Sequence, residues 1–254
     1  MKSKLLTDVE LRARWSQDRS ECYCVDDDVV LTPAAADFIR EHGITLCRKE
    51  KSAETMTRTQ IPMRDGKPVY QDAATGRETT CKGEGMTHLR GNLLVPKTHP
   101  QIAFRGKLDT LMAMIMHLQI LAQEQGQPRI ANDLDELLEF CHKILAAEVK
   151  DEPLKEVKML GMDSEQIRYN SQQVKKVFGI DHPIPNYKMG KLCVELNRLR
   201  TQIRETELAA AQAFYCGGSY SRPDIIEGLN RMSSCVYILM CRKLSGFYER
   251  GKRL

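Results

Sequence analysis

Apolar residues recur at helical spacing from about residue 86 almost to the end of the chain. Steps of three and four between apolar positions predict amphipathic helices. Four helices are strongly predicted, over residues 100–125, 130–149, 190–214 and 223–244, and a weaker one over 164–178. The stretch 108–122 is apolar almost all round. We therefore expect that helix to lie centrally in a bundle.

The first 48 residues follow a different pattern, with short apolar blocks around one helix. Residues 29–31 and 44–46 are typical of strands, and Thr32-Pro33 offers an N-cap residue followed by proline at the first helical position. A helix is predicted over 34–41, and a further short helix over 4–15. No internal repeat is evident.

Residues 49–85 are polar and lack a period, which is typical of a linker or irregular segment. The pattern therefore divides the chain into a small strand–helix–strand module (1–48), an irregular linker (49–85) and a helical domain (86–254).

The most distinctive polar pattern lies within the helix predicted over 190–214. Asn197, Arg200, Arg204 and Glu207 are spaced by three, four and three residues, so they share one stripe. Apolar residues adjoin this stripe, so we expect its charges to be partly buried. Buried charge is costly unless it is paired or binds an anion, which makes the stripe a candidate ligand site. The other interpretation is a solvated helix face with weak ion pairs.

The composition of the chain disfavours two classes of function, nucleic-acid binding and membrane spanning. The net charge is +4 and only 6% of the 254 residues are aromatic, which disfavours nucleic-acid binding. The stretch 108–122 is too short and too polar to span a bilayer. Nine scattered cysteines without a C-x-x-C motif favour a reduced, cytoplasmic location. Cys193, Cys235 and Cys241 fit best as core residues.

Four segments carry a resemblance. Residues 200–207 read Arg-Thr-x-x-Arg-x-x-Glu, and 229–233 read Leu-Asn-Arg-Met-Ser. Residues 95–109 run from Lys97 to Gly-x-Leu-Asp, and 32–46 follow Thr-Pro with a helix and a strand. Together these segments resemble the corrinoid adenosyltransferases, specifically the ethanolamine-utilization type.

The resemblance implies a mainly α fold, a five-helix up-and-down bundle with a small N-terminal α+β appendage. It implies a homo-oligomer with the active site between subunits, a trimer being favoured while a dimer stays open. The implied enzyme transfers the 5′-deoxyadenosyl group of ATP, with Mg²⁺, to cob(I)alamin and makes adenosylcobalamin. The implied partners are ethanolamine ammonia-lyase or its reactivase and a bacterial microcompartment shell.

The same resemblance suggests how ATP is held. Co(I) attacks C5′ in line, so the enzyme must orient ATP and stabilise charge on the leaving oxygen. Arg204 and Lys97 are expected to contact the triphosphate, because guanidinium and ammonium groups suit polyphosphate. Glu207 is expected to orient Arg204 or to hold the ribose or Mg²⁺.

The remaining implied roles fall on other elements. Arg200 is expected to pair with Asp109 across the subunit interface, although Asp109 also fits a simple acid in the first turn of a helix. Asn230 is expected to bond the nucleotide or help hold Mg²⁺, and Arg231 is a second phosphate candidate. His182, before Pro-Ile-Pro, is a candidate for the lower face of the corrin.

Two departures from the family pattern stand out. The Gly-rich ATP loop of the other main branch is represented only by residues 83–88, Gly-Glu-Gly-Met-Thr-His. The His and Cys-Cys-x-x-Cys cluster of many ethanolamine-type members is reduced to Cys81. Since one thiolate cannot form a tetrahedral site, we predict no structural iron or zinc.

Two other classes of protein stay open at this point. A corrinoid or nucleotide carrier without catalysis would not need the full set of Arg200, Arg204 and Glu207. A structural helical interaction module would not bind ATP.

Overall fold

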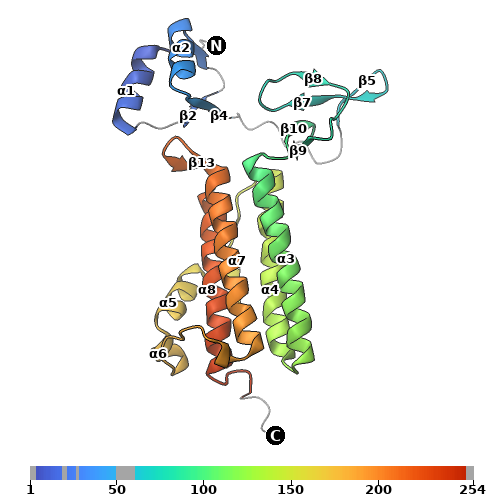
Figure 1. Cartoon of the computed structure of the whole chain (residues 1–254), viewed down its shortest axis with the longest axis vertical. Coiled ribbons are helices and arrows are strands. Elements are labelled where there is room, and N and C mark those ends of the chain that lie inside the picture. The colour runs from blue at the N-terminus through green and yellow to red at the C-terminus, as the bar shows by residue number, and fades with distance from the viewer. Residues whose placement is uncertain (1–3, 19–21, 27–28, 50–60, 250–254) are drawn as a thin grey trace. The chain divides into compact units, whose positions relative to one another are not determined.

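A computed structural model describes residues 4–18, 22–26, 29–49 and 61–249 (Figure 1). The chain divides into two compact units. One comprises residues 1–61 together with 214–221, and the other comprises 62–213 together with 222–254. Among the described helices, none combines the length and the apolar character needed to cross a membrane.

The first unit is built from two short parallel strand pairs, one antiparallel hairpin and two helices. Its elements are β1 (Lys4–Leu6), α1 (Asp8–Asp18), β2 (Cys22–Asp26), β3 (Val29–Leu31), α2 (Pro33–Glu41), β4 (Thr45–Lys49), β13 (Tyr215–Cys216) and β14 (Ser219–Tyr220). β1 pairs with β3 and β2 with β4. Its core includes Leu11, Ala35 and Phe38, all nearly inaccessible to solvent.

The predicted start of α2 is confirmed, because the Thr32 hydroxyl accepts the Ala35 N–H and Pro33 opens the helix. The helix predicted over 4–15 is wrong in its first three residues. These form β1, which is tied to β3 by parallel pairing.

The first unit also contains an internal repeat that the sequence pattern does not reveal. The elements β1–α1–β2 and β3–α2–β4 have the same order, and Leu6 pairs in register with Leu31. Each helix follows a threonine cap, since Thr7 and Glu10 bond each other as Thr32 bonds Ala35. Few identical side chains mark the two halves, so the repeat is visible in the backbone rather than in the sequence.

The second unit is dominated by the predicted helices. They are α3 (Pro100–Glu124), α4 (Pro128–Lys150), α5 (Ser164–Gln172), α6 (Val174–Phe178), α7 (Lys191–Phe214) and α8 (Pro223–Leu244), with the 3₁₀ turn η1 (Tyr187–Met189) before α7. Four of them are long and lie side by side, and the fifth predicted helix is split into α5 and α6 (Figure 1). The mainly helical fold is confirmed.

A small sheet precedes the bundle within the same unit. Its strands are β7 (Tyr70–Asp72), β8 (Glu78–Thr79), β9 (Met86–Arg90) and β10 (Leu93–Pro96), in the order β8-β7-β10-β9. The pairs β5 (Met63–Arg64) with β6 (Lys67–Pro68), and β11 (Lys158–Met159) with β12 (Met162–Asp163), form separate hairpins.

Residues 61–85 of the predicted irregular segment contain four short strands, β5 to β8, separated by turns and loops. Residues 50–60 of the predicted linker lie outside the described residues. The domain boundaries at residues 48 and 85 stay a prediction.

The position of α3 differs from the prediction. Leu108, Leu111 and Ile115 are fully buried, but Met116 and Ile120 are 48% and 59% exposed. The helix packs through one face, chiefly against α4, so its apolar outer residues are not enclosed by this chain.

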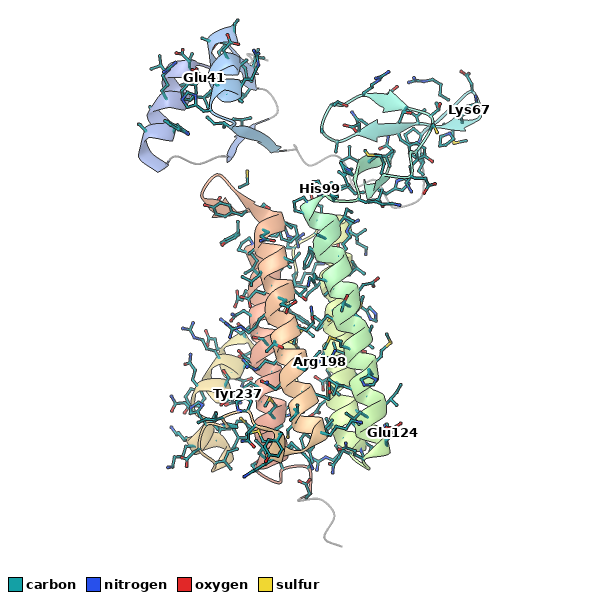
Figure 2. All side chains as sticks on the ribbon, viewed as in Figure 1. Glu41, Lys67, His99, Glu124, Arg198 and Tyr237 are labelled. Atoms are coloured by element: carbon teal, nitrogen blue, oxygen red, sulfur yellow. The ribbon has the colours of Figure 1, made fainter. Side chains whose placement is uncertain are left out.

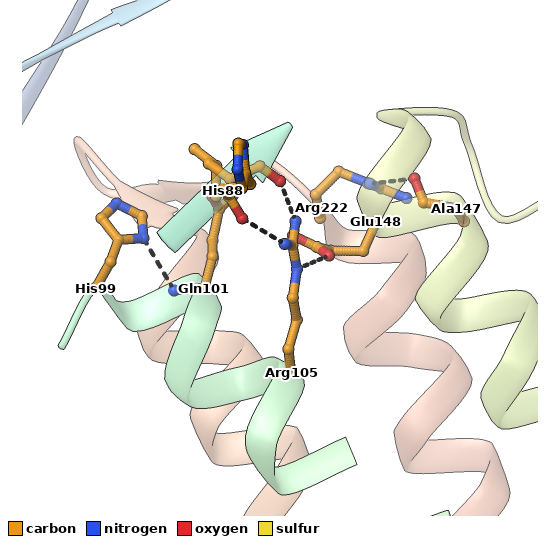
Figure 3. Close-up of polar contacts among 8 residues, drawn as sticks. His88, His99, Gln101, Arg105, Ala147, Glu148 and Arg222 are labelled. Atoms are coloured by element: carbon orange, nitrogen blue, oxygen red, sulfur yellow. Dashed lines mark hydrogen bonds and ion pairs between the residues drawn. The ribbon is translucent and has the colours of Figure 1, made fainter. Parts of the chain in front are cut away.

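A buried ion pair joins α3, α4 and the sheet (Figure 3). Arg105 on α3 donates through Nε and Nη2 to the two carboxylate oxygens of Glu148 on α4, at 2.6 and 3.1 Å. Its Nη1 and Nη2 also donate to the carbonyls of His88 and Leu89 on β9. Since the Glu148 side chain is only 1% exposed, the bidentate geometry and the strand carbonyls together offset the cost of burying both charges.

A second arginine closes the same end of α4. Arg222, directly before α8, donates two hydrogen bonds to the Asp224 carboxylate. It also donates to the carbonyls of Ala147 and Glu152. Ala147 lies in the last turn of α4, and Glu152 lies just beyond the end of that helix. Arg222 therefore ties the start of α8 to the end of α4.

Replacing Glu148 with alanine is expected to destabilise the protein by about 3–5 kcal/mol, because Arg105 would remain buried without its carboxylate. Urea unfolding of the variant would measure this loss. The matched control is Glu205→Ala, which breaks the exposed Lys107–Glu205 pair and should cost less than about 1 kcal/mol. An equal effect of the two variants would contradict the role given to the buried pair.

His99 is expected to make stability fall below pH 6.5. Its Nδ1 accepts the Gln101 N–H at the start of α3, and burial, followed by the nearby Arg105 charge, lowers the His99 pKa from 6.5. The unfolded chain therefore takes up this proton more readily, and the stabilisation present above pH 6.5 is lost as pH falls toward the folded pKa. In melting curves from pH 8 to 5, His99→Asn, which still caps the helix, should lose this component. Parallel pH profiles of the two proteins would contradict the prediction.

Candidate functional site

The polar stripe predicted on α7 is present, with graded exposure. Asn197, Arg200 and Glu207 are half-buried, whereas Arg204 is exposed. On the inner side of the same helix, Leu199 and Ile203 are fully buried. The expectation of partial burial therefore holds for three positions, and it is wrong for Arg204, whose side chain reaches solvent.

Two charged side chains of the site, Asp109 and Arg204, are unpaired within the part of the chain that the structure describes. Arg200 donates through Nε to Asn197 Oδ1 at 3.1 Å and forms no ion pair with Asp109. Asp109 is exposed on α3, and neither its side chain nor that of Arg204 has an ion pair or hydrogen bond among the described residues. The link between α3 and α7 at this level is Lys107 with Glu205, whose Nζ and Oε2 are 3.1 Å apart.

The two most specific motifs meet between α7 and α8. Asn230 on α8 donates through Nδ2 to Glu207 Oε1 on α7 at 3.1 Å. Arg231 donates through Nη1 to Asn230 Oδ1 at 2.8 Å. The neighbouring Leu229 and Met232 are fully buried, so α8 packs through them while Asn230 stays exposed beside α7.

Lys97 lies at the turn between β10 and α3. Its backbone N–H donates to the Gly85 carbonyl at 2.9 Å, and the Met86 N–H donates to the Gly83 carbonyl. The structure thus places the Lys97 backbone beside the glycine segment 83–85. Among the described residues, no hydrogen bond or ion pair connects Lys97 to the stripe on α7.

His182 contacts an aromatic residue that the sequence pattern did not single out. Its Nδ1 lies 2.9 Å from the Tyr237 hydroxyl on α8, and the two rings are stacked with centroids 6.2 Å apart. Burial, together with Cys241, raises the pKa of Tyr237 to about 12, so the phenol is neutral at physiological pH. Tyr237 lies seven residues after Asn230, on the same side of α8, and this spacing could have identified it. Figure 2 shows Tyr237 among the side chains that line α8.

The cysteines of the bundle are core residues, as predicted for Cys193, Cys235 and Cys241. Burial raises the pKa of Cys141 to about 12, so this thiol does not ionise at neutral pH. Cys81 is exposed, and the described residues contain no cluster of three or more His, Cys, Asp or Glu suited to a metal ion.

A helical bundle that gathers arginine, carboxylate and carboxamide groups on two adjacent helices fits an enzyme that binds a phosphorylated nucleotide. The cobalamin adenosyltransferase family model matches residues 78–243, and the chain belongs to that family. It is therefore a corrinoid adenosyltransferase, and cobalamin and ATP are its substrates.

Two relatives are similar over long stretches. The corrinoid adenosyltransferase EutT of Salmonella typhimurium is 29% identical over 249 residues, covering 92% of this chain and 90% of that protein. The EutT of Escherichia coli strain K12 is 36% identical over 160 residues, covering 63% of this chain and 58% of that protein. No solved structure matches significantly.

Proposed function

We propose that the chain holds MgATP against the α7–α8 face, with Arg204 on the triphosphate, and transfers the 5′-deoxyadenosyl group to cob(I)alamin. The observation that carries this proposal is the Asn230–Glu207 hydrogen bond, one helical turn from Arg204, whose side chain has no partner in the part of the chain that the structure describes. A guanidinium without a protein partner is available to an anion, and the neighbouring carboxylate and carboxamide offer oxygen donors of the type that Mg²⁺ prefers.

In the reaction, the Co(I) electron pair forms the bond to C5′ while the C5′–O bond breaks and its pair stays on the triphosphate. Arg204 stabilises that charge, and Lys97 adds a second cation at the glycine segment 83–85. Glu207 and Asn230 hold the ribose or Mg²⁺ and so keep C5′ exposed to attack.

The active site is completed by a second copy of the chain. Asp109, Ala113, Met116 and Ile120 follow one another at helical spacing along the exposed side of α3. Exposed apolar residues in a line with a carboxylate that forms no ion pair among the described residues favour a homo-oligomer in which Asp109 pairs with the partner's Arg200. A trimer is the favoured state, and a dimer remains open.

His182 approaches the lower face of the corrin, held there by Tyr237. The connection from 180 to 190 includes Ile184 and Tyr187, which are 81% and 82% exposed. Exposed apolar side chains on a connecting segment suit contact with a large, flat, mostly apolar ligand.

The product is proposed to serve ethanolamine ammonia-lyase in ethanolamine utilization, in the cytoplasm and in association with a microcompartment. The similarity to EutT extends over 92% of the chain and so includes the first unit. That unit is proposed to dock the lyase, its reactivase or the shell. The single Cys81 supports activity with Mg²⁺ and without structural iron or zinc.

Arg204→Ala is expected to lower the rate of adenosylation by about 100-fold, because one charge-stabilising group aimed at the leaving oxygen is lost. Anaerobic conversion of reduced cob(I)alamin to the light-sensitive product, with MgATP and metal-stripped protein, would measure it. The matched control is Arg198→Ala on the same helix, whose side chain is 68% exposed and pairs with Glu195. Equal rates of the two variants would overturn the proposed ATP site.

Tyr237→Phe is expected to raise the KM for cob(I)alamin about fivefold and to leave the KM for ATP unchanged, since only the bond to His182 is lost. Steady-state kinetics with each substrate varied in turn would test this. Tyr169→Phe on α5, an exposed tyrosine outside the 180–190 connection, is the control. A change in the KM for ATP alone would contradict the corrinoid role.

A further inference from the structure

A chain of hydrogen bonds leads from the start of α5 into the nucleotide site. Ser164 Oγ donates to Glu227 Oε1 at 2.7 Å and accepts from Arg231 Nε at 2.8 Å. Arg231 then donates to Asn230, which donates to Glu207. The chain thus connects three helices, α5, α8 and α7, through side chains alone.

We propose that Ser164 and Glu227 are positioning residues that hold Arg231 and, through it, fix Asn230 and Glu207 for ATP binding. This inference rests on the proposed function, because it takes Asn230 and Glu207 as the groups that meet the nucleotide. It adds two residues that lie outside the α7 stripe and the Leu-Asn-Arg motif.

The chemistry of the chain allows one orientation of the Asn230 amide. Arg231 can only donate hydrogen bonds, and the ionised Glu207 can only accept them. The amide oxygen must therefore face Arg231 and the amide nitrogen must face Glu207. A reversed amide would lose both bonds, so Arg231 determines which Asn230 atoms remain for a ligand.

Arg231 is itself held on three sides. Its Nε bonds Ser164, its Nη1 bonds Asn230, and its Nη2 lies 3.6 Å from Glu227 Oε1. The Arg231 side chain is only 16% exposed. Its nitrogens are thus engaged within the protein, which favours a positioning role for Arg231 over the phosphate contact suggested by the sequence.

The Ser164 hydroxyl is well placed to anchor this chain because its backbone is fixed. Asp163 and Gln166 form a reciprocal capping box, in which the Asp163 side chain accepts the Gln166 N–H and the Gln166 side chain accepts the Asp163 N–H. Ser164 is the first residue of α5, directly after that cap. A rigid helix start can therefore set the position of a guanidinium on the neighbouring helix.

The test is steady-state kinetics of the full-length protein with cob(I)alamin and MgATP. Ser164→Ala should raise the KM for ATP about five- to tenfold and leave the KM for cob(I)alamin unchanged. Ser164→Thr and Glu227→Gln should stay close to the original protein, because the hydroxyl and the accepting oxygen are kept. The matched control is Ser171→Ala on α5, whose hydroxyl bonds only the Arg168 carbonyl.

Asn230→Ala separates this inference from the proposed function. It should raise the KM for ATP, and adding Ser164→Ala to it should have no further effect, since the two residues act through one chain. An unchanged KM in Asn230→Ala would overturn the proposed nucleotide site itself. If Asn230→Ala has the expected effect but Ser164→Ala matches Ser171→Ala, or if the double variant is additive, the positioning role is wrong.

Discussion

The bidentate pair between Arg105 and Glu148 is the interaction on which the arrangement of the second unit depends. It is formed where α3 begins, α4 ends and β9 passes, and each of these elements contributes a partner. A guanidinium can satisfy a carboxylate and two carbonyls at once because its donors lie in a fixed plane. This fixes how β10 runs into α3, and with it the position of the turn that carries Lys97 beside the glycine segment.

The polar side chains on α7 and α8 are of two kinds: some are hydrogen-bonded to one another, and one has no partner among the described residues. Asn230, Glu207 and Arg231 are bonded to one another, whereas Arg204 is exposed and unpaired among the described residues. A held carboxylate loses little entropy when a ligand arrives, and an unpaired guanidinium loses no existing bond. Both properties suit the nucleotide binding proposed for this face, where a strongly charged ligand would have to bind and a strongly charged product would have to leave.

The sequence was sufficient for the long helices and for the α7 stripe, because both are periodic within one segment. It was not sufficient for groups whose partners are distant along the chain. Arg105 and Glu148 are separated by 43 positions, and Ser164 and Arg231 by 67, so no local spacing marks either pair. The small sheet was missed for a related reason, since its strands of two to five residues are too short to show a clear alternation. The outer side of α3 was misjudged because an apolar residue gives the same sequence pattern whether its side chain is buried, as Ile115 is, or exposed, as Met116 and Ile120 are.

The composition of the first unit has a consequence for the order in which the protein folds. Residues 1–61 leave the ribosome first, but residues 214–221 belong to the same compact unit and are made only after 62–213. Contacts between segments so distant in sequence raise the contact order and slow folding. The apolar core of this unit, however, comes from residues 6–44, and both parallel strand pairs lie within residues 4–49. The N-terminal segment can therefore pack before α7 is made, whereas the contact of β2 with β13 has to wait for the end of that helix.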